Sequence, residues 1–477
     1  MNKIHPQGSA PHSAISQSRW ARFIVAGCVL LVLLALLPRR ERDKPGTDPT
    51  STITPGQVTP ANSADGKLWS ERLRRSRSIA APAPTAEEIV AGKVREFGRA
   101  RREVVRAIAR RTQKEIPPEV EAFFDAIESG NWQEIERLGK ALGRRSGQYE
   151  GSTHWEELNP FWPAVLDAYG VAEQAHLWPA QKLLDYGNAI LDSLRPGMVY
   201  VGGTDPGRWI PELLNETSGA EQHIIVTQNA FADGRYLEFM QTLYGDQFAT
   251  LTQEDSKRAF DEYVADARKR FEHDQQFPDE PRQVRPSENI RMEDGKFQVT
   301  GQVSVMAINE KMLHMLMEKN PDLAFAMEES FPFKSMFASA TPLGPIMELR
   351  VQDEQNALTS ERASQSVDYW RTIARQLLSD PEATDSRDVR LSYSKLVSSQ
   401  AGLLLERGYV AEAEQAFRIA NEMAPSSPEA VFRYVNLLVE QGRYQDAMPI
   451  AQNAVKIEPE NQQFRNLMEE LKRMNRK

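Results

Sequence analysis

The C-terminal part of the chain repeats with a spacing of 34 residues, and this period constrains the fold more than any other feature. Small residues, glycine and proline recur in register. The matching pairs are Ala401 and Val435, Leu404 and Leu438, Gly408 and Gly442, Ala413 and Ala447, Ala420 and Ala454, and Pro425 and Pro459. Small residues let two helices approach closely, glycine suits the turn between them, and proline cannot continue a helix. The period therefore predicts helical hairpins that stack on one another.

These positions resemble those of the tetratricopeptide repeat, with one repeat at residues 394–427 and a second at 428–461. Ala451 replaces the usual aromatic residue and weakens the second repeat. Because two repeats alone are marginally stable, we expect the helices between Ser366 and Arg390 and the tail from Asn461 to Met474 to cap the stack. The resemblance implies a protein partner for the array; packing against the rest of the chain is the alternative.

A second informative stretch runs from Arg195 to Gly234, where two short apolar runs flank a glycine-bearing loop. The runs, Met198–Val201 and His223–Val226, predict strands buried on both faces. The loop leaves the end of the first strand, where open α/β sheets bind their ligands. We therefore expect the best candidate site here, and its ligand-binding candidates are Gly202, Gly203, Thr204, Asp205, Arg208, Gln228 and Asn229.

The loop sequence TDPGR leaves two interpretations open. We expect the following helix to begin near Trp209, because Pro211 is tolerated in the first turn of a helix but not in its interior. An anion could then bind at the helix N-terminus with the help of Arg208. The alternative, which we favour, is a tight turn in which Asp205 binds backbone N–H groups. The glycines match neither a dinucleotide-binding fingerprint nor a P-loop, so no nucleotide is predicted.

Further strands and helices alternate after this loop, which predicts a mostly parallel sheet in a Rossmann-like domain. The expected strands are Gln247–Leu251, Lys296–Thr300, Leu323–Glu328 and Ile346–Val351, and the expected helices are Tyr236–Tyr244, Asp255–Glu272 and Asn309–Lys319. Glu328 and Glu329 form a pair of carboxylates at a strand end. Neighbours in a strand point to opposite faces, so we expect a structural or surface role rather than acid–base catalysis.

Several ordered segments between Ala180 and Leu378 resemble one bacterial family. The segments are GGTDPGRW, IIVTQNAFADG, LYGDQ, INEKMLHMLM, AMEESFPFKSMF and TPLGPIMELR. They are similar to the soluble, extracytoplasmic portion of the protein O-mannosyltransferase-like membrane proteins, a domain of unknown function grouped as glycosyltransferase family 117. Members of that family resemble multi-span enzymes that take sugar from a lipid-linked donor. This chain has one apolar span and no acidic loop between spans, so the resemblance implies the soluble module without catalytic residues.

The segment Phe23–Leu37 is uncharged and apolar, and it predicts a single-pass contact with the lipid bilayer. Leu37 followed by Pro38 disfavours cleavage as a signal peptide. Basic residues flank the segment almost evenly, so charge does not decide its orientation. The family resemblance implies an inner-membrane protein whose soluble part lies in the periplasm or otherwise outside the cytoplasm.

Composition excludes several functions. The net charge of −9 argues against nucleic-acid binding. Cys28 is the only cysteine, which excludes disulfides within the chain and cysteine-based zinc sites. The seven histidines show no ligand spacing, so we expect no metal and no cofactor. No pairing of a nucleophile with a base stands out, and the residues leave catalysis and oligomeric state open.

The expected fold class is α/β plus all-α. The expected domains are an N-terminal tail and anchor (1–44), a Pro/Ser/Thr linker (45–84), a helical region (85–179), a Rossmann-like domain (180–360) and the repeat domain (361–477). The helical region opens with an arginine-rich helix, for which a solvated or packed face is favoured over a membrane surface. The sequence predicts an envelope-facing interaction scaffold. The alternative is a non-catalytic glycosylation component that binds a sugar or sugar phosphate at the GGTDPGR loop.

Overall fold

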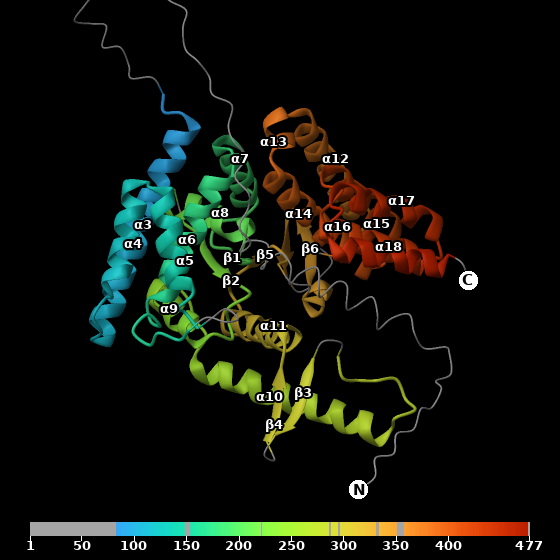
Figure 1. Cartoon of the computed structure of the whole chain (residues 1–477), viewed down its shortest axis with the longest axis horizontal. Helices are drawn as coiled ribbons and strands as arrows, with labels where there is room; N and C mark the ends of the chain where they lie inside the picture. Colours follow the sequence, from blue (N-terminus) through green and yellow to red (C-terminus); the bar gives the residue numbers. More distant parts are fainter. Residues whose placement is uncertain are drawn as a thin grey trace, which may run out of the picture.

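The computed structural model describes residues 83–147, 153–220, 222–285, 288–293, 296–330, 333–350 and 357–475. Within these ranges the protein is mostly helical, with 16 α-helices and a small mixed sheet (Figure 1). The anchor expected at Phe23–Leu37 lies outside the described residues. Among the helices that are described, none combines the length and the apolar composition needed to cross a membrane.

The N-terminal helices pack around the arginine-rich helix α3. They are α3 (Ala86–Thr112), α4 (Pro118–Ser129), α5 (Trp132–Gly143), α6 (Trp162–Leu177) and α7 (Ala180–Leu191). Thr85 and Glu88 start α3 with a capping box. Arg102 then pairs with carboxylates of α4, among them Glu121 and Glu128. The basic face of α3 is therefore partly neutralised by a neighbouring helix.

The five-stranded sheet has the order β2-β1-β5-β7-β6. Its strands are β1 (Val199–Gly202), β2 (Ile224–Thr227), β5 (Phe325–Met327), β6 (Ala340–Leu343) and β7 (Ile346–Leu349). β1 is parallel to β2 and β5, whereas β7 is antiparallel to β5 and β6. The expectation of a mostly parallel sheet was therefore only partly correct. A short turn at Gly344, whose φ is +54°, joins β6 to β7, and strands joined by so short a turn must be antiparallel.

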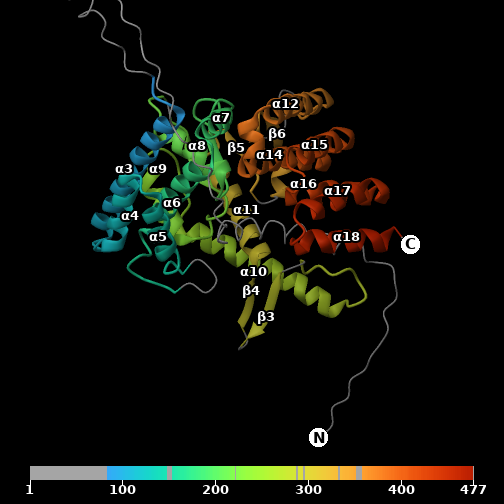
Figure 2. The same ribbon diagram turned by 45° about the horizontal axis from the view of Figure 1, so that its top comes forward.

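Two expected strands differ in the structure. Residues 247–251 form no strand, because the side-chain amide of Asn320 donates to and accepts from the backbone of Ala249 in place of a neighbouring strand. Residues 296–300 do form a strand, β4 (Lys296–Thr300), but it pairs with β3 (Asn289–Glu293) in a separate hairpin. This hairpin lies with the helices α10 (Gln253–Gln276) and α11 (Gln302–Lys319) on one side of the molecule (Figure 2). The helix α9 (Gly234–Tyr244) follows β2 in the chain, and the 3-10 helix η1 (Lys334–Ala338) follows β5.

Helix α8 (Pro206–Glu216) begins at Pro206, three residues before Trp209, where we expected it. Pro211 lies inside this helix, so the carbonyl of Gly207 loses the N–H that would normally bond to it. The hydroxyl of Tyr200 on β1 donates to that carbonyl at 2.5 Å. This replacement partner accounts for an interior proline that the sequence argument excluded.

The C-terminal helices form an array beside the sheet, with α14 next to β6 in both views (Figures 1 and 2). Its helices are α12 (Ser360–Ser379), α13 (Pro381–Asp385), α14 (Arg387–Glu406), α15 (Val410–Met423), α16 (Pro428–Glu440), α17 (Tyr444–Ile457) and α18 (Gln462–Met474). Gly408 and Gly442 lie in the turns with φ of +84° and +73°. The repeated alanines are fully buried at Ala413, Ala420, Ala447 and Ala454, and the second helix of each hairpin ends just before Pro425 or Pro459.

Candidate functional site

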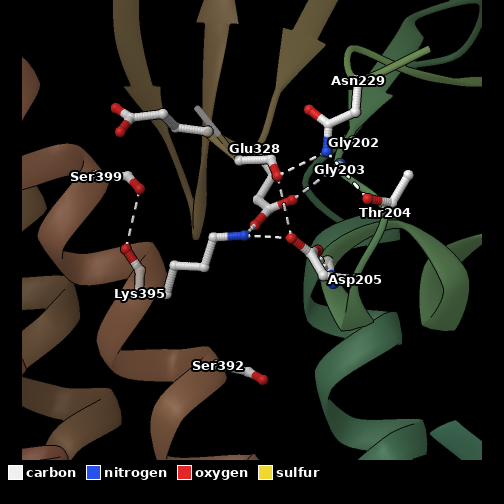
Figure 3. A network of polar contacts seen from close by, with 12 residues as sticks. Gly202, Gly203, Thr204, Asp205, Asn229, Glu328, Ser392, Lys395 and Ser399 are labelled. Carbon is white, nitrogen blue, oxygen red and sulfur yellow. Dashed lines mark hydrogen bonds and ion pairs between the residues drawn. The ribbon is translucent and has the colours of Figure 1, made fainter. Parts of the chain in front are cut away.

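Three loops meet at the carboxyl ends of the parallel strands β1, β2 and β5. β1 is the switch point of the sheet, because β2 lies on one side of it and β5 on the other. Ligands of open α/β sheets bind at this edge. The structure brings Gly203, Thr204, Asp205, Gln228 and Asn229 together here, as Figure 3 shows for most of them. Glu328 and Ser330, which follow β5, complete the group.

The two glycines of the loop permit close packing. A Cβ atom on Gly202 would lie 2.6 Å from Cβ of Arg208, and one on Gly203 would lie 2.5 Å from Cβ of Ser330. Neither glycine has a positive φ. Their role is therefore to let neighbouring side chains approach the backbone, and the space that they leave is filled by the chain itself.

Asp205 occupies the N-terminus of α8, where an anion could otherwise bind. Its Oδ1 accepts a hydrogen bond from the N–H of Gly207 at 2.9 Å. Its Oδ2 lies 2.5 Å from the ammonium nitrogen of Lys395 on α14. The loop is thus the tight turn of the alternative interpretation, with a carboxylate of the chain in the place of a bound anion.

Lys395 also binds Glu328, and these three residues form what we name the edge cluster: Asp205, Glu328 and Lys395. The Lys395 Nζ lies 2.6 Å from Oε1 of Glu328, between the two carboxylates (Figure 3). The N–H of Gly203 donates to Oε2 of Glu328 at 3.3 Å. Glu328 is fully buried, and its neighbour Glu329 is buried too and pairs with Arg433 of α16. A surface role for either carboxylate was therefore wrong.

Burial sets the protonation of the edge cluster. Burial, with the nearby charge of Asp205, raises the pKa of Glu328 to about 7, although Lys395 opposes the shift. Burial alone would lower the pKa of Lys395, but Asp205 and Glu328 together raise it well above its usual value. Lys395 therefore remains charged, whereas Glu328 exchanges its proton near neutral pH.

Arg208 turns away from the loop and belongs to a second group, which we name the helix cluster: Arg101, Asp167, Arg208, Glu212 and Glu216. The guanidinium of Arg208 lies 2.7 Å from Asp167 and 3.2 Å from Glu212. Arg101 of α3 binds Glu216 at 2.6 Å and Glu212 at 3.0 Å. Burial raises the pKa of Glu212 to about 8 although both arginines lower it. Because two carboxylates already bind its guanidinium, Arg208 is not placed to hold an anion at the loop.

The side chains of Gln228 and Asn229 differ in how many of their polar atoms form hydrogen bonds. The amide of Gln228 donates to the backbone oxygen of Glu328 at 2.6 Å and so ties two loops together. The amide nitrogen of Asn229 lies 3.1 Å from the hydroxyls of Thr204 and Ser330. Its side-chain oxygen is buried and has no hydrogen-bond partner among the described residues. Asn229 is therefore the loop residue with an acceptor left for a ligand or a water.

Comparison with known proteins identifies the C-terminal array. The family model of the tetratricopeptide repeat matches residues 404–471. Residues 404–471, from the end of α14 into α18, are therefore assigned to tetratricopeptide repeats. The searches of curated proteins and of solved structures gave no match. The resemblance to the glycosyltransferase-like family gains no support from these comparisons, and it stays a prediction.

Helix α14 and the turn after it contact the β6–β7 hairpin and η1 through polar side chains besides Lys395. The amide of Gln400 donates to the backbone oxygens of Gly344 and Ile346 at 2.8 Å each. Arg407 donates to the oxygen of Ala338 at 3.0 Å. Sequence reasoning missed these residues, since a lysine, a glutamine or an arginine on a helix carries no local sign of a partner far away in the chain.

The polar groups of the edge cluster are engaged with one another and with α14. The hydroxyl of Ser330 lies 3.3 Å from Oδ2 of Asp205, but that oxygen is already bound by Lys395. No group of three potential metal ligands occurs among the residues that the structure describes. The edge cluster holds α14 against the loops at the carboxyl ends of β1 and β5.

Proposed function

We propose that the chain is a membrane-tethered scaffold of the cell envelope, in which the tetratricopeptide repeats and the α/β domain act as one docking unit. The repeat match supports a protein–protein interaction module. The tether would be Phe23–Leu37 in the inner membrane, with the soluble part outside the cytoplasm. The domain division at residues 85–179, 180–360 and 361–477 belongs to the same proposal. The apolar segment and the family resemblance support these finer points.

The observation that carries the proposal is the fastening of the first repeat to the sheet. Lys395, Gln400 and Arg407 all reach atoms of the α/β half. Stacked repeats use their extended surfaces to bind partners. Here the side of α14 that faces the sheet is already filled by the chain itself. A partner must therefore bind the later repeats or the side of the array turned away from the sheet.

The test uses Ala447, which is fully buried between the paired helices. Ala447→Leu adds three carbons to this contact, and overpacking of this kind costs about 1–3 kcal/mol. Ala411→Leu makes the same change at an exposed position on α15 and serves as the control. Full-length protein would be cross-linked in its native membranes, and the cross-linked partners identified by mass spectrometry. We expect Ala447→Leu to lose partners that Ala411→Leu keeps.

Hydrogen exchange on α16 and α17 would show whether the repeats have opened in the Ala447→Leu variant. If they have opened and the same partners still cross-link with the same yield, the repeats do not carry the interaction. That result would overturn the proposed function.

Asn229 favours a second candidate, an accessory glycosylation component that binds a neutral sugar. Its buried, unpartnered side-chain oxygen could accept a hydrogen bond from a sugar hydroxyl. A sugar phosphate suits the site less well, because the edge cluster holds two carboxyls and one cation. Calorimetric titration of full-length protein with hexoses and hexose phosphates tests this candidate. A signal that Asn229→Ala leaves unchanged would rule out the loop as the site.

A further inference from the structure

A groove lies between α12 and α15, two helices of the C-terminal array that pack together (Figure 2). It encloses about 340 Å³. Its lining includes Arg371, Ala374, Arg375 and Leu378 of α12, and Ile419 and Glu422 of α15. This volume is at the lower end of the range for small-molecule pockets, and it suits a single large side chain better than an extended ligand.

The floor of the groove is apolar. Ala374 and Ile419 are buried there, and Leu378 lies one helical turn after Ala374 on the same face of α12. The side chain of Leu378 is 43% exposed, which places it among the large apolar residues that the described part of the chain leaves open to water. Covering it with an apolar side chain of a partner would be favourable.

The rim of the groove carries an arginine without a counter-charge. Arg371 is paired with Asp368 and also donates to Gln415 at 3.1 Å. Arg375 donates only to neutral oxygens, the backbone oxygen of Arg371 at 3.3 Å and the hydroxyl of Thr372 at 3.5 Å. Within the described ranges, no carboxylate forms an ion pair with Arg375. A cation therefore stands beside an apolar floor.

We propose that this groove binds a segment of a protein partner that presents a large apolar side chain next to a carboxylate. The apolar side chain would cover Ala374, Leu378 and Ile419, and the carboxylate would pair with Arg375. Charge complementarity favours this partner, because Arg375 forms no ion pair among the described residues, whereas the other arginine of the lining, Arg371, is already paired with Asp368. The inference rests on the proposed function and names the partner chemistry and the face of the array.

The experiment measures the binding of short synthetic peptides to full-length protein by fluorescence anisotropy. The probe carries one leucine flanked by aspartates. A second peptide has lysines in place of the aspartates, and a third has serine in place of the leucine. We expect the acidic leucine peptide to bind most tightly and to bind more weakly at high salt, because an exposed ion pair is screened.

Two variants locate the binding. Arg375→Glu and Leu378→Ser should each weaken binding of the acidic leucine peptide by about tenfold. Arg137→Glu, at a 63% exposed arginine on α5, is the matched control and should change little. Circular dichroism would verify that all three variants keep the helical content of the wild type.

Each other outcome overturns the proposal. The acidic leucine peptide could fail to bind, bind both groove variants as tightly as the wild type, or bind no better than the lysine peptide. Self-association that Arg375→Glu abolishes would identify a second copy of the chain as the occupant instead. The cross-linking result with Ala447→Leu is independent of all of these outcomes. The groove proposal can therefore be refuted while the proposed interaction function stands, and the interaction function can be refuted while the groove still binds the peptide.

Discussion

The helix cluster and the edge cluster meet at the start of α8, and they differ in what they connect. The helix cluster joins α3, α6 and α8, which are packed neighbours in the first half of the molecule. The edge cluster joins two loops of the sheet to α14 of the repeats. Asp205 and Arg208 are only three residues apart, yet they belong to different clusters. Two ion clusters of similar chemistry therefore hold together either helices of the first half of the molecule or the sheet loops and the C-terminal helices.

The clusters share an excess of carboxyls over cations. The helix cluster has three carboxyls and two arginines, and the edge cluster has two carboxyls and one lysine. In each, burial raises the pKa of one carboxyl, that of Glu212 to about 8 and that of Glu328 to about 7. A proton on that carboxyl brings each cluster to neutrality. The difference lies in exposure, because Asp205 is partly open to water whereas Asp167 and Glu212 are not.

The largest effect is expected from Arg101→Met, which leaves two buried carboxyls and the partly buried Glu216 with Arg208 alone. Removing one partner from a buried ionic group costs about 3–5 kcal/mol. The free energy of unfolding, measured with urea, should fall by that amount, and hydrogen exchange should rise first in α3 and α6. Arg99→Met is the control, since Arg99 is 64% exposed in its pair with Glu128 and should contribute less than about 1 kcal/mol. Equal losses in both variants would contradict this account of the helix cluster.

Lys395→Met should have a smaller effect and a different location. Glu328 can respond by keeping its proton and Asp205 is partly hydrated, so we expect a loss of about 2–3 kcal/mol. Hydrogen exchange should rise in α14 and at the β6–β7 hairpin while α3 and α6 stay protected. Lys472→Met, at an exposed lysine of α18, is the control. Adding Glu328→Gln to Lys395→Met should recover part of the loss, because glutamine replaces a carboxyl that must otherwise take up a proton on folding. Faster exchange in α3 would mean that the two clusters are not separate units.

The pH dependence of stability follows from the two raised pKa values. A carboxyl whose pKa is higher in the folded state binds its proton more tightly there, so stability is greatest at low pH and falls as the pH rises. The fall should begin near the ordinary glutamate pKa of about 4.3 and end near 7 for Glu328 and near 8 for Glu212. Glu328→Gln should make this slope shallower between about pH 4.3 and 7 and leave the part due to Glu212, an effect on the order of 2 kcal/mol. Urea unfolding at several pH values tests this, and a slope that Glu328→Gln leaves unaltered would refute the assignment.

The smallest effect is expected from Gly207→Ala. A Cβ atom here would lie 2.3 Å from the carboxyl carbon of Glu328 and would push that carboxyl away from Lys395. We expect a loss of about 1–2 kcal/mol, seen as a lower melting temperature and faster exchange in α14. Gly219→Ala is the matched control, because no atom lies within 4 Å of its added Cβ. A melting temperature that Gly207→Ala leaves unchanged would show that the edge cluster tolerates displacement of Glu328.

The sequence predicted the elements whose residues are set by local patterns. The repeat helices follow from alanines and glycines in register, and β1 and β2 were expected within one residue of their observed ends. The sequence predictions failed where a side chain far away in the sequence forms the hydrogen bond that a neighbouring strand or helical turn would normally form. Asn320 satisfies the backbone of Ala249, and Tyr200 compensates for Pro211. β6 was missed because Pro342 interrupts its strand pattern, although proline is tolerated on an edge strand.

The sequence predicted where the candidate site lies but not which side chains contact one another there. The loop after β1 does lie at the carboxyl end of a parallel strand, as expected, whereas the sequence did not show that β1 is the switch point of the sheet. Lys395 binds this loop through Asp205, from which it is separated by 190 residues in the sequence, and no local pattern relates the two. Arg208 was assigned to the loop because it is adjacent in sequence, but the helical turn directs it to Asp167 instead.

The contact between Lys395 and the loop has a consequence for how such a chain can evolve. A repeat array can be exchanged between proteins only if it does not depend on the rest of its chain, but α14 of this array carries Lys395, which pairs with Asp205 and Glu328 of the sheet loops. A recombination that substituted foreign repeats would leave the partly exposed Asp205 and the buried Glu328 next to each other without a cation. The loop and the first repeat must therefore be inherited as a pair, and a change in either should be accompanied by a change in the other.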